Sequence, residues 1–363
     1  MDKAHPSRYS SSVRTHRALA ALSCLLLLPA AAAAKTRLKD VLRQFEGGKL
    51  EDRLRLAPAL GHAKEKKAVD ALINAFDIKR GNPRETAAIV EALGRAGDPR
   101  AVESLVGAMD YLRSMMLQME LPGHLQVLRW KILEALSRLG GEQTVGILSE
   151  ALNDRDPRVV EEAVRGLGRL QVKAAVPALL ELSRGASSGN LTQAVIEALG
   201  EIGDKRAVSV LEQALKTSDR FVEVEAAYAL ARLGRKEMYD KLADNLKGDP
   251  GAEKVGILAA YYLAKLGRSA GLDHLVGLMK RTDGGYASLA AEALGKSENP
   301  RAVLPLVEAS RSEDSSLRLS VARSLGRLGG TRALSSLKRL RNDPNPGVRN
   351  AALASLAELG VLD

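Results

Sequence analysis

The stretch EALGRAGDPRAVESL at residues 91–105 returns as EALGEIGDKRAVSVL at 197–211 and as EALGKSENPRAVLPL at 292–306. The Leu in its third position has equivalents throughout the chain, at steps of 33, 43, 31, 32, 31, 33, 31, 31 and 31 residues. These ten anchor residues are Leu60, Leu93, Leu136, Leu167, Leu199, Leu230, Leu263, Leu294, Leu325 and Leu356. Self-similarity at a nearly fixed period is typical of repeat architectures, so we predict ten copies of one unit, with an insertion in the second step.

Each unit has the pattern of two short helices. The residue four before the anchor Leu is apolar in all ten copies, which marks one helix face, and the residue after it is always small, which favours close approach of a neighbouring helix. Gly lies four residues after the anchor in seven copies, as a helix C-cap. DPR at 98–100 or NPR at 299–301 then begins another helix, with Asp or Asn as N-cap and Pro in the first turn.

The sequence predicts an all-α fold, because no segment has the pattern of a strand. One helical hairpin cannot bury its apolar face alone, whereas stacked copies can. Aromatic residues make up only 3% of the chain, so we expect a core of Leu, Ala and Val. The predicted solenoid covers residues 35–363 and carries its insertion near residues 108–125.

The pattern ALGxxGDPRAV followed by LxxAL resembles HEAT repeats, and among them the short variety named after phycobilisome lyases. The resemblance covers roughly residues 36–363. It implies a right-handed α-α superhelix, a HEAT-repeat solenoid of about ten helical hairpins, in which the second helix of each pair lines the concave surface. The group includes scaffolds, bilin lyases and deoxyhypusine hydroxylase, so the resemblance specifies the fold better than the function.

The N-terminal segment has a composition of its own. It opens with four basic residues: Lys3, Arg8, Arg14 and Arg17. The apolar run ALAALSCLLLLPAAAAA follows at 18–34 and ends in small residues. This order predicts a secretory signal peptide over residues 1–34, cleaved near Ala33 or Ala34, and an exported, periplasmic or secreted protein. The alternative is an uncleaved membrane anchor, for which a run interrupted by Pro29 is short.

Charge and cysteine content narrow the expected partners. The whole chain has 54 basic and 44 acidic residues, and loss of the signal peptide leaves 50 and 43, a net charge of +7. A basic balance favours nucleic acid, an anionic membrane surface or acidic proteins, and nucleic acid is not expected for an exported chain. Cys24 is the one cysteine, so the cleaved product has no disulfide.

No catalytic or metal-binding motif is evident in the sequence. His62, His124 and His274 remain after cleavage, lie in different repeats and form no His-Glu pair. By resemblance, deoxyhypusine hydroxylase holds its metals through paired His-Glu motifs, so that activity is not carried over. There is no Cys/His cluster, phosphate loop or GxSxG elbow. We therefore expect a chain that is not an enzyme and that binds no metal or cofactor.

The first predicted partner site follows the anchor helices. Residues two before and two after each anchor face away from the core and neighbour each other, so they form the rungs of a ladder. Four rungs are basic or combine Tyr with a cation: Tyr228 with Arg232, Tyr261 with Lys265, Arg165 with Arg169, and Arg323 with Arg327. Tyr and Arg dominate protein interfaces, so we expect a protein or an acidic peptide along this groove. As alternatives, Glu197 and Glu201 neutralise a neighbouring rung, and the cations complement helix dipoles.

The second predicted partner site is the insertion, AMDYLRSMMLQMELPGHLQVLRW at 108–130. No helix breaker occurs between residue 100 and Pro122, so we expect a helix of about 20 residues. Met-rich surfaces adapt to varied partners. The candidate residues are Met109, Leu112, Met116, Met119 and Trp130. The alternative is that this apolar stripe packs on the following helix.

Taken together, these patterns predict an exported, non-catalytic scaffold that binds a protein or peptide along its concave surface. The first alternative is an enzyme or enzyme-assisting subunit of the HEAT-like lyase group. The second is a protein that binds anionic membrane surfaces through weak electrostatic contact. The last helix, within NAALASLAELGVLD at 350–363, stays apolar without a polar cap, which predicts a homodimer through an open C-terminal end.

Overall fold

The computed structural model describes residues 30–63, 65–185, 189–247, 252–281, 285–359 and 361. Within these ranges the chain forms twenty α-helices, α2 to α21, and four short 3₁₀ helices, with no strand. The predicted all-α solenoid is therefore confirmed. Residues 1–29 of the predicted signal peptide lie outside the described residues. No helix of the described part is both long and apolar enough to be a candidate membrane span.

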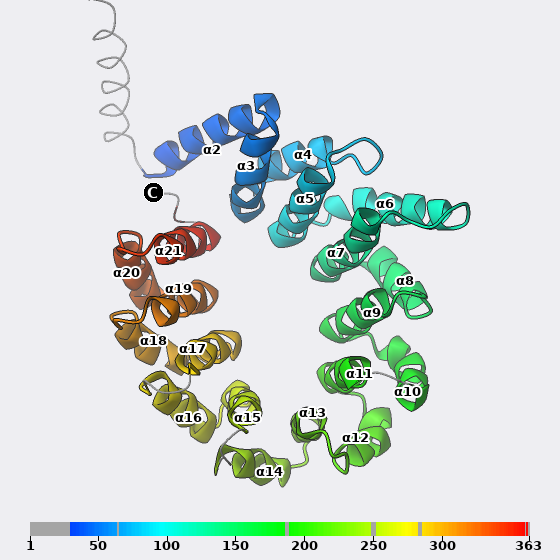
Figure 1. The fold of residues 1–363 in the computed structure, drawn as a ribbon, viewed down its shortest axis with the longest axis vertical. Helices are drawn as coiled ribbons and strands as arrows, with labels where there is room; N and C mark the ends of the chain where they lie inside the picture. The colour runs from blue at the N-terminus through cyan, green and yellow to red at the C-terminus, as the bar shows by residue number, and fades with distance from the viewer. Residues whose placement is uncertain are drawn as a thin grey trace, which may run out of the picture.

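The ten anchor leucines lie on ten helices that form the inner layer of the molecule (Figure 1). These are α3 (Leu50–Ala63), α5 (Pro83–Ala96), α7 (Gly123–Leu139), α9 (Pro157–Arg169), α11 (Gly189–Ile202), α13 (Arg220–Arg232), α15 (Glu253–Lys265), α17 (Ala287–Lys296), α19 (Ser315–Leu328) and α21 (Pro346–Glu358).

The helix before each of them belongs to the outer layer. The outer helices are α2 (Ala30–Gly47), α4 (Lys66–Ala75), α6 (Ala101–Met116), α8 (Glu142–Ala151), α10 (Val176–Gly185), α12 (Val208–Ala214), α14 (Met238–Asp244), α16 (Ser269–Met279), α18 (Val303–Ala309) and α20 (Thr331–Leu340). The 3₁₀ helices are η2 (Lys173–Ala175), η3 (Lys205–Ala207), η4 (Asn245–Lys247) and η5 (Pro300–Ala302).

Neighbouring inner helices approach each other through small residues, as the glycine pattern predicted. A Cβ atom added to Gly94 would lie 2.7 Å from the Cα of Ala135, and one added to Gly168 would lie 2.7 Å from the Cα of Ala198. The residue just before the anchor is Ala, Gly or Ser in nine of the ten repeats, and Tyr262 is the exception. The inner layer is therefore tightly stacked except where this tyrosine enters.

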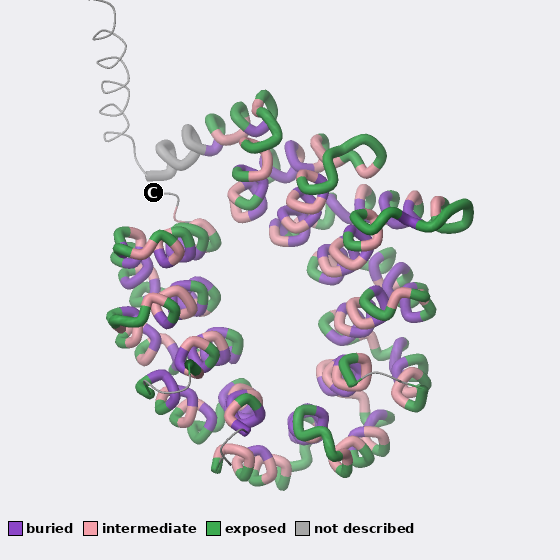
Figure 2. The backbone as a smooth tube through the Cα atoms, viewed as in Figure 1, coloured by how far each residue is buried: buried purple, intermediate pink, exposed green. Residues whose placement is uncertain are grey.

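The hydrophobic core is interrupted at that tyrosine. One cluster of buried residues runs from Leu38 to Leu230 and another from Ile257 to Leu356. A small third cluster lies between them and contains Tyr262. Figure 2 shows the buried positions concentrated where the helices face one another. The wall of the solenoid thus changes its packing between α13 and α15.

The repeats curve so far that the two ends of the solenoid meet (Figure 1). Helix α21 packs against α3, and His62 Nε2 lies 3.7 Å from Glu358 Oε1. The predicted open C-terminal end is therefore wrong. A small rotation at each repeat, accumulated over ten repeats, brings the last helix back to the first. The homodimer stays a prediction, but the open C-terminal helix from which it was predicted is covered by α3.

The insertion is shorter as a helix than predicted. Helix α6 has 16 residues and ends at Met116, and α7 begins only at Gly123. The carbonyl of Met115 accepts the N–H groups of both Gln118 and Met119, which closes the helix before Pro122 is reached. The expected helix of about 20 residues is therefore wrong, and residues 117–122 form a loop.

Candidate functional site

Glu201 joins three of the predicted rung residues on the inner layer. Its carboxylate, on α11, lies 2.9 Å from Lys265 Nζ and 3.1 Å from Arg232 Nη1. The hydroxyl of Tyr228 lies 3.3 Å from the same carboxylate. The structure therefore brings the Tyr228/Arg232 rung and Lys265 together, as the ladder predicted. It also shows that Arg232 and Lys265 already form ion pairs with Glu201 of the same chain.

Tyr228 is not available to a partner. Its side chain is only 2% exposed, and its ring stacks on that of Tyr262 with 3.9 Å between centroids. The prediction that it faces away from the core is wrong, because Tyr262 replaces the usual small residue and forms a separate apolar cluster around both rings. Tyr261 is half-buried, with its ring centroid 4.8 Å from that of Tyr262.

The ammonium of Lys265 lies over two of these aromatic rings. Its Nζ is 5.5 Å from the ring centroid of Tyr228 and 5.8 Å from that of Tyr261, which is cation–π distance. Burial lowers the pKa of Lys265, but Tyr261 and Glu201 outweigh it, so the pKa lies above its usual value. Burial raises the pKa of Tyr228 to about 12. Lys265 is therefore a fixed positive charge and Tyr228 stays neutral.

Glu225 is a buried carboxyl behind these tyrosines. It is 2% exposed, accepts a hydrogen bond from the Tyr262 hydroxyl, and lies 3.4 Å from Gln193 Nε2. Burial raises the pKa of Glu225 to about 8, with a further contribution from the charge of Glu197. The group is therefore mostly protonated at neutral pH.

A pocket of about 240 Å³ opens on the inner face next to this cluster. Its lining comes from α9, α11 and α15: Arg165, Gly168, Arg169, Glu197, Ala198, Glu201 and Lys265. Lys265 and Glu201 are paired with each other. In this pocket Arg165 and Arg169, which form one predicted rung, therefore lie on the side opposite Glu197 of the next rung.

The two arginines form no ion pair within 4.0 Å with Glu197, although the charge of Arg165 acts on its carboxyl. Arg165 Nη2 lies 3.6 Å from Glu161, and Arg169 Nη1 lies 3.8 Å from Glu162, both on their own helix. Among the described residues Glu197 has no hydrogen bond and no ion pair within 4.0 Å. The alternative in which Glu197 and Glu201 pair with this rung is therefore wrong, since Glu201 pairs with Lys265 and Arg232 instead.

Two carboxyl groups at this site have pKa values raised by burial. Burial raises the pKa of Glu197, against the lowering effect of Arg165. Burial also raises the pKa of Glu162 to about 7, although Arg169 lowers it. Perturbed carboxyls that line or adjoin a pocket are typical of sites that transfer protons.

The remaining basic rung lies elsewhere on the inner layer. Arg323 and Arg327 are exposed on α19 and line a different pocket, of about 460 Å³, together with residues of α21. The eight predicted partner-binding residues thus fall into two separate sites. Whether either site binds a protein stays a prediction.

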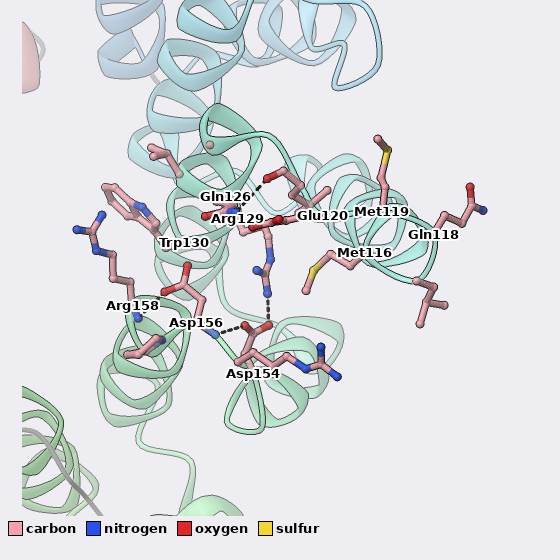
Figure 3. Close-up of a pocket in the computed structure, with 16 residues that line it drawn as sticks. Met116, Gln118, Met119, Glu120, Gln126, Arg129, Trp130, Asp154, Asp156 and Arg158 are labelled. Atoms are coloured by element: carbon pink, nitrogen blue, oxygen red, sulfur yellow. Dashed lines mark hydrogen bonds and ion pairs between the residues drawn. The ribbon is translucent and has the colours of Figure 1, made fainter.

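Some residues of the second predicted partner site are buried and others are exposed. Met109 and Leu112 are buried in the core, as the alternative predicted. Met116 and Met119 are exposed and, with Trp130, line a pocket of about 970 Å³ between the loop after α6, helix α7 and the start of α9 (Figure 3). An ion pair between Arg129 and Asp154 lies within this pocket.

Sequence reasoning missed Glu162, Glu225 and Tyr262 as parts of the site. Tyr262 was detectable, because it alone breaks the rule of a small residue before the anchor. Glu162 and Glu225 both lie five residues before an anchor. That position is one helical turn before the small residue that directly precedes the anchor, so it faces the contact between repeats.

The metal sites that the resemblance to deoxyhypusine hydroxylase implies do not fit the residues that the structure describes. Over the described ranges, no group of three or more His, Cys, Asp or Glu side chains is placed to hold a metal ion. The paired His-Glu sets that the resemblance implies have no counterpart there.

Two curated relatives are enzymes. The chain is 32% identical to bovine (Bos taurus) deoxyhypusine hydroxylase over 111 residues, which are 30% of this chain and 36% of the relative. It thus spans about a third of that protein. It is 28% identical to deoxyhypusine hydroxylase-B of rice (Oryza sativa subsp. japonica) over 236 residues, 64% of this chain and 76% of the relative.

These relatives correct the function expected from the sequence. The chain was expected to be a non-catalytic scaffold and not an enzyme, whereas both relatives are hydroxylases. The description as a scaffold is corrected with it. Export to the periplasm or out of the cell stays a prediction. The sequence argument rested on the lack of a familiar catalytic motif, and such a lack does not exclude an enzyme.

Two solved structures share the repeat architecture only loosely. Human deoxyhypusine hydroxylase in complex with glycerol gives a TM-score of 0.36 at 20% identity and covers 72% of this chain and 99% of its own. The phycocyanin lyase complex from Nostoc gives 0.38 at 21% identity and covers 79% of this chain and 92% of its own. Similarities this low carry no argument about function.

Family models match most of the helical repeats. The HEAT repeats model matches residues 125–190, 176–254 and 272–357, which together are more than half of the chain. The PBS lyase HEAT-like repeat model matches residues 87–111, which include the whole of the repeated stretch at residues 91–105. The repeat spacing, the inner and outer helix layers and these matches agree. The chain belongs to the HEAT-repeat family.

Proposed function

We propose that this chain is an enzyme, or an enzyme-assisting subunit of the HEAT-like lyase group, that works by proton transfer at the pocket between α9, α11 and α15. The observation that carries the proposal is Glu197. It lines the pocket, it has no hydrogen bond or ion pair within the described residues, and burial raises its pKa. A substrate in the pocket would meet this carboxyl directly.

The chemistry asks for a group that can both accept and give a proton. General acid–base catalysis is most effective when the pKa of the group lies near the working pH, and burial moves Glu197 in that direction. The guanidinium groups of Arg165 and Arg169 also line the pocket. They stabilise the carboxylate that forms when Glu197 donates its proton to a substrate atom.

The neighbouring groups keep this arrangement fixed. Glu201 accepts hydrogen bonds from Lys265 and Arg232, so its carboxylate is already engaged and proton transfer is left to Glu197. Behind it, the protonated Glu225 and Tyr262 form a buried pair that needs no counter-ion. Rigid supporting groups of this kind are what a catalytic residue needs to hold its geometry.

The names of the relatives supply the first substrate to test. They act on deoxyhypusine, and their sequence similarity to this chain supports an enzymatic role without fixing the reaction. Hydroxylation is not assigned here, because the described residues offer no metal-binding set. The proposal is therefore limited to proton transfer on a substrate held against Glu197.

The test compares the full-length protein with its Glu197→Gln variant. Each is incubated with a deoxyhypusine-bearing protein and, separately, with a metabolite extract of the source organism, and conversion is followed by mass spectrometry. We expect a conversion by the wild type that falls about 100-fold or more in the variant, the usual scale for loss of a general acid or base. Glu181→Gln, at an 81% exposed side chain on α10, is the matched control and should convert normally.

Two outcomes contradict the proposal. One is that the wild-type protein converts nothing in either mixture. The other is that Glu197→Gln converts a substrate as fast as the wild type does.

A further inference from the structure

Opposite charges face each other across the inner pocket without pairing. Arg165 and Arg169 come from α9 and Glu197 comes from α11, and all three line the same 240 Å³. Arg165 has an ion pair at 3.6 Å with Glu161 of its own helix. Arg169 has one at 3.8 Å with Glu162, and it donates a hydrogen bond to Ser137 on α7. The pocket between these opposite charges is open, so a ligand can enter it and contact both sides.

The pocket suits neither a simple anion nor a simple cation. An anion between the two arginines would also face Glu197, and a cation at Glu197 would also face the arginines. Lys265 does not change this balance, because Glu201 holds it at 2.9 Å. A ligand that carries one charge of each sign meets both sides favourably.

From this arrangement we propose that the pocket binds a zwitterion of amino-acid size, with its carboxylate between Arg165 and Arg169 and its ammonium against Glu197. The volume agrees with this ligand class. Pockets for drug-sized molecules hold roughly 300–1,000 Å³, so 240 Å³ suits a smaller molecule. Arginine is also the side chain best shaped for a carboxylate, through paired hydrogen bonds.

The inference deepens the proposed function and rests on it in one respect. If Glu197 is the proton-transfer group, the amine of the zwitterion is the atom it faces, and its N–H proton is the one that Glu197 takes up and returns. Binding itself needs only the charges, so it can be measured without any turnover.

Binding is measured by isothermal titration on the full-length protein, with each of the neutral proteinogenic amino acids as probe. Acetate and ethylamine, which each carry one half of the zwitterion, are the comparison ligands. We expect at least one amino acid to bind, and acetate and ethylamine each to bind about tenfold more weakly or worse, since each lacks one charge-assisted contact.

Two single variants on different helices test the two ends of the ligand. Glu197→Gln and Arg165→Gln should each weaken amino-acid binding about tenfold or more. Arg323→Gln is the matched control, because it removes an inner-layer arginine from the other pocket and should leave binding unchanged. Helical content by circular dichroism confirms that each variant is folded.

The inference is overturned if no amino acid binds up to millimolar concentration, if acetate binds as well as the amino acid, or if neither variant weakens binding. These results differ from a failure of the proposed function. Amino-acid binding without any conversion supports the zwitterion site and contradicts the proton-transfer role of Glu197. Conversion that depends on Glu197 but is not inhibited by any amino acid supports the proton-transfer role and contradicts the zwitterion site.

Discussion

The buried carboxyl of Glu225 makes a sharp prediction about stability and pH. Its pKa is raised from 4.5 to about 8, first by burial. Between these two values the folded protein holds a proton that the unfolded chain has released. The folded state therefore binds more protons, and the free energy of unfolding falls as pH rises from 4.5 to 8.

The size of this effect follows from the two pKa values. A tenfold change in proton affinity is worth about 1.4 kcal/mol, so Glu225 costs the folded state about 3 kcal/mol at pH 7 and about 4 kcal/mol at pH 8, relative to pH below 4.5. Glu225→Gln removes the titration and keeps an amide oxygen to accept from Tyr262. We therefore expect the variant to be more stable than the wild type at pH 8, and nearly equal to it at pH 5.

The stability difference is measured by amide hydrogen exchange of α13 and α15 at pH 5 and pH 8. This method reports the stability of single helices, which is needed because a repeat protein can unfold in parts. Glu162→Gln should act in the same direction over a narrower pH window, because the pKa of Glu162 is about 7. Glu181→Gln changes an exposed carboxyl and should alter nothing. The reasoning is refuted if Glu225→Gln lowers protection at pH 8, or if its gain over the wild type is the same at pH 5 and pH 8.

Three further predictions concern packing. Tyr262→Ala removes a ring stacked 3.9 Å from that of Tyr228 and should destabilise the protein by about 3–5 kcal/mol in urea unfolding, whereas a loss below 1 kcal/mol would contradict the wedge between α13 and α15. Gly168→Ala should cost about 1–3 kcal/mol of stability, because its Cβ would lie 2.7 Å from the Cα of Ala198. Gly107→Ala is the control and should be neutral or stabilising, because its Cβ would meet nothing within 4 Å. Equal melting temperatures for the two variants would refute the close approach at Gly168. Deletion of residues 346–363 should speed amide exchange in α3 but not in α9, and an unchanged α3 would show that the ring is not closed.

The fold was predictable because its determinants repeat. Ten anchor leucines, each with a small residue after it, define the inner layer, and any one copy can be checked against nine others. The closure of the ring was not predictable in this way. It depends on small rotations that add up from α3 to α21, and no local pattern near His62 or Glu358 reports their sum.

The site was only partly predictable. The ladder argument placed Arg232 and Lys265 correctly on the inner layer, because helical spacing alone decides which face a residue occupies. It failed for Tyr228, because the burial of that ring depends on Tyr262 in the next repeat. Which acid pairs with which base also depends on side-chain packing, and so the unpaired Glu197 came to light only in the structure.

We propose that the pocket at Glu197 is the catalytic site of an enzyme. The most direct measurement is the rate of substrate conversion by the wild type and by Glu197→Gln, compared side by side at equal helical content. We expect conversion by the wild type and a loss of about 100-fold or more in the variant. Equal rates for the two proteins would contradict it.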